Sequence, residues 1–170
     1  MAKRVTMKKE YTLPMKGLTE TPEGFIQVPK VELRAMTTME EKTRLSGNGY
    51  RTLINLLKSC CNTKVDLENM NTGDVQYMIY MLRSLTYGAN YDVSVQCPVC
   101  GKINKMTVNL EELPVNEDMD DDFNGIKELD HLPVSGDIIT CKLETSKDLE
   151  AIDREVARIH RKFPEYVGDP

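Results

Sequence analysis

The sequence predicts an α+β fold, and changes in the spacing of apolar residues carry that prediction. Between residues 50 and 87, apolar side chains recur every three or four positions, as on amphipathic helices. From about Tyr91 to Leu110 they alternate with polar ones, as in β-strands, and after residue 145 the helical spacing returns. We therefore expect an extended N-terminal arm, a small helical lobe, a zinc-knuckle-like β-hairpin joined to a short sheet, and a C-terminal amphipathic helix.

Residues 1–30 are expected to form the extended arm. Proline and glycine recur through this segment, which disfavours helices and long strands. We expect the arm to lie on another subunit or along the helical lobe, and the rest of the chain to fold without residues 1–20. Its apolar side chains are too many for a free tail: Tyr11, Leu13, Phe25, Ile26 and Val28.

Residues 31–89 are expected to form the helical lobe after a short first strand. One helix is capped by Thr37 or Thr38, with glutamates at capping-box spacing, and a later one by Asn71 or Thr72. Two apolar stripes predict helices that pack face to face. They are Tyr50, Leu53, Ile54, Leu57 and Cys61 on the first helix, and Val75, Met78, Ile79, Leu82 and Leu85 on the second.

The segment Cys97-Pro98-Val99-Cys100-Gly101 lies between two alternating runs and has the form of a zinc knuckle. The glycine relieves the tight turn, and backbone N–H groups there can point at the thiolates. A structural zinc needs four ligands, and this motif supplies two. The sequence therefore predicts a β-hairpin with Cys97 and Cys100 as candidate zinc ligands.

His131 and Cys141 are the candidates to complete this zinc site, with Cys60 and Cys61 as further options. Each cysteine also has a plain interpretation as a small buried residue. Three alternatives stay open: a zinc bound within one chain, a knuckle completed by a partner subunit, and a knuckle that has lost its metal.

Residues 90–163 are expected to hold the knuckle hairpin, short strands and the last helix, followed by a tail over 164–170. Residues 111–122 contain seven acidic and no basic side chains, which predicts a solvated loop. After a strand over 138–143, the last helix begins at Thr145 or Ser146. Its apolar face carries Leu149, Ile152, Val156 and Ile159.

Composition excludes several classes of function. A net charge of −5 over 170 residues argues against nucleic-acid binding, which needs a basic surface. No apolar run approaches the ~20 residues that cross a bilayer, and no secretory signal is visible. Nucleophilic catalysis needs a partner base, yet His131 and His160 are the only histidines. We therefore expect a protein of the cytoplasm that is not an enzyme, inserts into no membrane, and keeps its five cysteines reduced.

The order of several segments resembles one family of viral proteins. A Tyr11-Thr12-Leu13-Pro14 segment precedes Leu33-Arg34-Ala35-Met36-Thr37, which is followed by Glu40-Glu41-Lys42. The cysteine turn, Leu132-Pro133-Val134-Ser135-Gly136 and a Thr145-x-x-Asp148 helix start come next. This succession resembles the baseplate proteins of T4-like contractile-tailed bacteriophages, in particular the small baseplate hub proteins.

The resemblance implies a structural or assembly component of a phage tail baseplate, in the hub region. It implies a place in the virion, after assembly in the host cytoplasm, and contacts with other baseplate, hub and tail proteins in several copies. It brings no catalytic residues. The alternative that the residues leave open is a cytoplasmic zinc-knuckle adaptor that binds a protein partner outside any virion.

Overall fold

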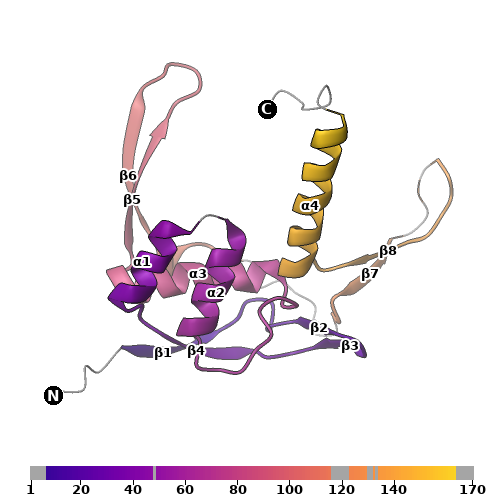
Figure 1. The fold of residues 1–170 in the computed structure, drawn as a ribbon, viewed down its shortest axis with the longest axis horizontal. Coiled ribbons are helices and arrows are strands. Elements are labelled where there is room, and N and C mark those ends of the chain that lie inside the picture. Colours follow the sequence, from indigo (N-terminus) through magenta and orange to yellow (C-terminus); the bar gives the residue numbers. More distant parts are fainter. Residues whose placement is uncertain (1–6, 48, 116–122, 130–131, 133, 164–170) are drawn as a thin grey trace.

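The computed structural model confirms an α+β fold with helices and small antiparallel sheets (Figure 1). It describes residues 7–47, 49–115, 123–129, 132 and 134–163. Within these ranges the strands form four two-stranded antiparallel pairs: β1 with β4, β2 with β3, β5 with β6, and β7 with β8. The predicted acidic loop lies partly outside the described residues, and the predicted tail entirely so.

The N-terminal segment differs from the expected extended arm, because from Lys8 onward it forms short strands, and its buried side chains Tyr11 and Leu13 are part of the core. Strand β1 (Lys8–Thr12) pairs with β4 (Lys30–Arg34), so that Tyr11 lies opposite Val31. Between them β2 (Thr19–Thr21) and β3 (Gly24–Ile26) form a second hairpin. The paired residues of β1 and β4 are 18 to 26 positions apart, and no local sequence pattern predicts this pairing, which orders the segment.

The helical lobe contains three helices, and two of them, α1 and α3, begin at the predicted caps. Helix α1 (Thr38–Ser46) begins at a capping box made by Thr37 and Glu40. Helix α2 (Tyr50–Cys60) leads to α3 (Thr72–Tyr87), whose N-cap is Asn71. These caps occupy N–H groups that have no partner within the first turn of a helix.

The core forms where α2 and α3 pack with β1 and β4. Five of the ten predicted stripe residues are buried in it, and the other five are only partly buried: Tyr50, Leu53, Cys61, Ile79 and Leu85. The buried cysteine at the end of α2 is Cys60 rather than Cys61. Its buried members come from both helices, from the segment between them and from the N-terminal segment, and they include Tyr11, Leu13, Val31, Leu33, Ile54, Leu57, Cys60, Leu67, Met70, Val75, Met78, Met81 and Leu82.

A buried carboxylate joins the N-terminal segment to α3. Asp74 is fully buried and accepts hydrogen bonds from the N–H groups of Met15 (2.9 Å) and Gly17 (2.8 Å) and from the Asn71 side-chain amide (2.7 Å). Gly17 has a φ of +63°, and a Cβ there would lie 2.1 Å from the Val28 carbonyl oxygen. Only glycine fits, because both the backbone angle and the space exclude a side chain.

Three elements project from the core (Figure 1). They are the hairpin of β5 (Asn90–Gln96) and β6 (Ile103–Asn109), the hairpin of β7 (Ile126–Leu129) and β8 (Ile139–Lys142), and helix α4 (Ser146–Lys162). The short helical turn η1 (Leu110–Glu112) follows β6 and returns the chain to α3. Most residues of the projecting elements are exposed, apolar ones included.

Candidate interaction site

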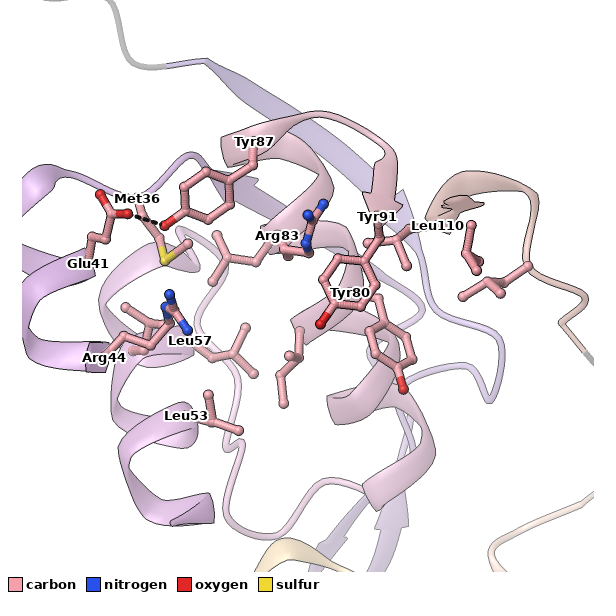
Figure 2. A pocket seen from close by; sticks show the side chains of 15 residues that line it. Met36, Glu41, Arg44, Leu53, Leu57, Tyr80, Arg83, Tyr87, Tyr91 and Leu110 are labelled. Carbon is pink, nitrogen blue, oxygen red and sulfur yellow. Dashed lines mark hydrogen bonds between the residues drawn. The ribbon is translucent and has the colours of Figure 1, made fainter. Parts of the chain in front are cut away.

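A cavity of about 690 Å³ opens between the three helices of the lobe and the base of the β5–β6 hairpin (Figure 2). Its wall is formed mainly by apolar side chains from α2, α3, β6 and η1. Three tyrosines and two arginines line it as well. The lining residues include Leu53, Leu56, Leu57, Ile79, Leu82, Val108, Leu110 and Leu113, together with Tyr80, Tyr87, Tyr91, Arg44 and Arg83.

Arg83 fixes one edge of this cavity. Its guanidinium donates to the carbonyl oxygens of Gly88 (2.9 Å) and Asn90 (3.3 Å), just beyond the end of α3. The same group lies 4.4 Å from the ring centroid of Tyr91, a cation–π contact that joins α3 to β5. The hairpin is therefore held at its base, and the cavity between it and the lobe is preformed.

Tyr87 and Arg44 form the opposite edge. The Tyr87 hydroxyl donates to Glu41 Oε1 at 2.6 Å, as Figure 2 shows. Burial, followed by the bond to the Glu41 carboxylate, raises the pKa of Tyr87 above its ordinary value. The Nε of Arg44 is buried and has no hydrogen-bond partner among the described residues. A buried N–H without an acceptor is costly, so an occupant with an oxygen there would gain a hydrogen bond.

The tip of the β5–β6 hairpin is a tight turn at the predicted cysteine segment. Gly101 N–H donates to the Cys97 carbonyl oxygen at 2.9 Å, with Gly101 in the left-handed region at φ +69°. Hydrogen bonds from the N–H groups of Cys100 and Val99, and from the Cys100 thiol, lower the pKa of the Cys97 thiol. A thiol of lowered pKa is closer to the thiolate form that binds zinc.

Of the other candidate zinc ligands, the three cysteines are not brought to this tip. Cys141 lies on β8, and Figure 1 shows that hairpin on the opposite side of the molecule from β5–β6. Cys60 is buried in the core, where burial raises the pKa of its thiol to about 11, and the Cys61 thiol donates to the Thr63 carbonyl oxygen at 3.3 Å. His131 lies outside the described residues. A zinc site at Cys97 and Cys100 stays a prediction.

The cavity residues were missed by the sequence reasoning. The apolar spacing of its helix assigns no role to Arg83, and it assigns none to Tyr80, Tyr87 or Tyr91. One signal was present: Arg83 and Tyr87 stand one helical turn apart, a spacing at which side chains meet. The contribution of Arg44 could not be found this way, because it depends on how α1 packs against α2.

Neither a metal-binding cluster nor a membrane helix is found in the part of the chain that the structure describes. No three His, Cys, Asp or Glu side chains there gather as metal ligands would. No described helix combines the length and the apolar character needed to cross a bilayer. A small core with a preformed apolar cavity and exposed projecting elements is typical of structural proteins that bind other proteins.

Comparison with known proteins identifies the family. The family model described as T4 bacteriophage base plate protein matches residues 6–160, and the chain belongs to this family. No curated protein and no solved structure matches the chain. Membership confirms the resemblance found in the sequence.

The family gives the protein its general role. It is a structural protein of the phage tail baseplate, with a place in the tail of the virion and contacts to other phage tail proteins. A structural family of this kind agrees with the expectation of a protein without enzymatic activity. It also favours the baseplate role over that of an adaptor outside a virion.

Proposed function

We propose that this protein is a component of the baseplate hub region and holds a neighbouring tail protein through the cavity between the lobe and the β5–β6 hairpin. The observation that carries the proposal is the cavity itself, preformed, largely apolar and edged by tyrosine and arginine. Tyrosine and arginine are enriched among the residues that dominate binding energy at protein interfaces. A role in assembly, in several copies and beginning in the host cytoplasm, belongs to the same proposal.

The chemistry of the cavity specifies its occupant. Leucine, isoleucine and valine side chains on the wall favour an apolar anchor, because burying such a group removes apolar surface from water. The unpaired Nε–H of Arg44 requires a hydrogen-bond acceptor beside that anchor. The occupant is therefore a segment of a neighbouring tail protein in which a large apolar side chain stands next to a carbonyl or carboxylate oxygen.

Two substitutions test the cavity in the assembling phage. Tyr80→Ala removes an aromatic wall, and Arg44→Lys keeps the positive charge but removes the Nε donor. Both positions are partly exposed, so we expect the variants to fold and to lose assembled tails, counted by electron microscopy. Ile26→Ala on β3 is the matched control, since this exposed apolar residue does not line the cavity. Wild-type tail yields from Tyr80→Ala and Arg44→Lys would refute the proposed contact.

The hub position needs a separate measurement. Lys42 is exposed on α1, next to Glu41 on the cavity edge, and can report neighbours by lysine cross-linking of purified baseplates. We expect cross-links from Lys42 to proteins on the central axis of the tail. Cross-links to peripheral baseplate proteins alone would contradict the hub position without affecting the cavity.

A further inference from the structure

Helix α4 leaves its apolar face uncovered in the described structure. Ile152, Val156 and Ile159 keep 52%, 42% and 38% of their surface exposed. The helix is attached to the core only near its start: Lys147 N–H donates to the Glu68 carbonyl oxygen at 2.9 Å, and the hydroxyls of Ser146 and Tyr50 are 3.2 Å apart. Figure 1 shows the rest of α4 standing away from the lobe.

The apolar residues on this face have the spacing of a seam, the line of contact along which two paired helices pack. Leu149, Ile152, Val156 and Ile159 are separated by three, four and three residues, which is the 3.5-residue repeat of paired helices. β-Branched residues occupy three of these four positions. Such a narrow stripe is suited to one partner helix, whereas a helix on a globular core carries a wider one.

The charges along α4 select the partner and its direction. The first half, residues 146–155, carries four acidic and two basic side chains. The second half, residues 156–162, carries three arginine or lysine residues, one histidine and no acid. A parallel copy would place acid beside acid and base beside base. An antiparallel copy places each acidic half beside a basic half, and it also opposes the two helix dipoles.

We propose that α4 is a self-association element, through which two copies of this chain pair antiparallel along Leu149, Ile152, Val156 and Ile159. The pairing is isologous and closes at two copies. Since each core is attached at the start of α4, the two cores lie at opposite ends of the pair, about 25 Å apart along 17 residues of helix. This inference does not depend on the hub position or on the cavity.

The test is the oligomeric state of the full chain, measured by sedimentation equilibrium from micromolar to millimolar concentration, because a seam this short predicts weak association. The wild type should form a reversible dimer. Ile152→Asp with Val156→Asp should weaken dimerisation about tenfold or more, with an unchanged melting temperature, because both positions are exposed. Arg154→Ala on the opposite face is the control and should dimerise as the wild type does.

Direction is tested by reversing charge. Arg161→Glu with Lys162→Glu places acids beside the acidic start of the partner helix and should weaken an antiparallel pair, and adding Glu150→Lys should partly restore it. Circular dichroism checks that α4 stays helical in each variant. A chain that is monomeric at every concentration would overturn the proposal, even if α4 then binds a different tail protein. Dimerisation that is unaffected or strengthened by the Arg161 and Lys162 changes would overturn the antiparallel direction.

Discussion

Helices α3 and α4 have similar sequence patterns and opposite surroundings. On α3, the apolar stripe that includes Val75, Met78 and Leu82 is buried against α2 and the strands of the core. On α4, Leu149 is partly buried near the core, and the rest of the corresponding stripe, Ile152, Val156 and Ile159, is exposed. An amphipathic stripe therefore predicts that a face requires a cover, and it does not say whether the cover comes from the same chain or from another one.

The two helices also begin alike. Each has a polar N-cap, Asn71 or Thr145, and an aspartate three residues later. Asp74 is fully buried and binds the N-terminal segment, whereas Asp148 closes a local capping box with Thr145 and remains partly exposed. One cap signal thus serves a long-range role in α3 and a local role in α4.

Shortening the chain from either end should give the largest difference in stability, because the two ends contribute differently to the core. Deleting residues 1–20 removes β1, Leu13, Leu18 and the donors to Asp74, so we expect a chain that does not fold. A chain that ends at Asp148 loses the exposed stretch of α4 and should keep its core. Circular dichroism and thermal melting measure both. If the chain without residues 1–20 still unfolds cooperatively on heating, then these residues are not needed for folding, as the sequence led us to expect.

Single truncations of side chains sharpen the same contrast. Met78→Ala on α3 removes a fully buried side chain and should lower the free energy of unfolding by about 2–5 kcal/mol. Ile152→Ala on α4 removes an exposed one and should change it by less than about 0.5 kcal/mol. Urea denaturation at low protein concentration, where the chain is monomeric, gives both values. Equal losses would mean that α4 is covered within its own chain.

Replacing the two capping aspartates should likewise cost more stability on α3 than on α4. Asp74→Ala removes the acceptor of the Met15 and Gly17 N–H groups and one of the two acceptors of the Asn71 amide, and should cost roughly 3 kcal/mol of unfolding free energy. Asp148→Ala removes half of a capping box and should cost about 1 kcal/mol. The comparison is made in the same urea titrations. If the Asp148 variant lost as much as the Asp74 variant, the attachment of α4 would matter to the core.

Ion pairs in the two regions should differ in their pH dependence. Hydrogen bonds from Arg34 lower the pKa of Glu40 from 4.5 to about 2. Because the folded-state pKa is lowered, the stabilisation is complete above pH 4.5 and is lost as the pH falls towards 2. Glu40→Gln should therefore lower the free energy of unfolding by about 1 kcal/mol at neutral pH. It should also flatten the acid limb of the profile, which is the fall in this free energy at low pH.

Glu155 on α4 is the matched control for this pH profile. Its hydrogen bonds from Arg158 lower its pKa, but the pair is exposed and screened by solvent. Glu155→Gln should leave the acid limb unchanged. A flattened profile from Glu155→Gln, or an unchanged one from Glu40→Gln, would contradict the assignment of this effect to the partly buried pair.

The smallest effect is expected at the hairpin tip. Cys97→Ser with Cys100→Ser should hardly change the melting temperature of the isolated chain, because the described residues bring only two thiols together there. Elemental analysis should find less than stoichiometric zinc, and chelation should not lower the melting temperature. Stoichiometric zinc would show that His131 or another residue completes the site, and then chelation should destabilise the hairpin.

The sequence by itself determined the local features of this protein. The capping boxes at Thr37 and Thr145, the N-cap Asn71, the change of period at the hairpin and the tight cysteine turn all depend on residues within a few positions of one another. Local hydrogen bonding and the exclusion of apolar side chains from water fix these features before any tertiary contact is chosen. The order of such segments along the chain was also sufficient to indicate the family.

Only the tertiary structure decided which segments meet. The pairing of β1 with β4, the two backbone donors to Asp74 from 57 and 59 residues away, and the cavity edge made by Arg44 join parts of the chain that no spacing rule connects. Burial is the other such decision, because periodicity reports that a face is apolar but not what covers it. That is why α3 and α4 could be predicted equally well as helices, and yet one lies in the core while the other projects from it.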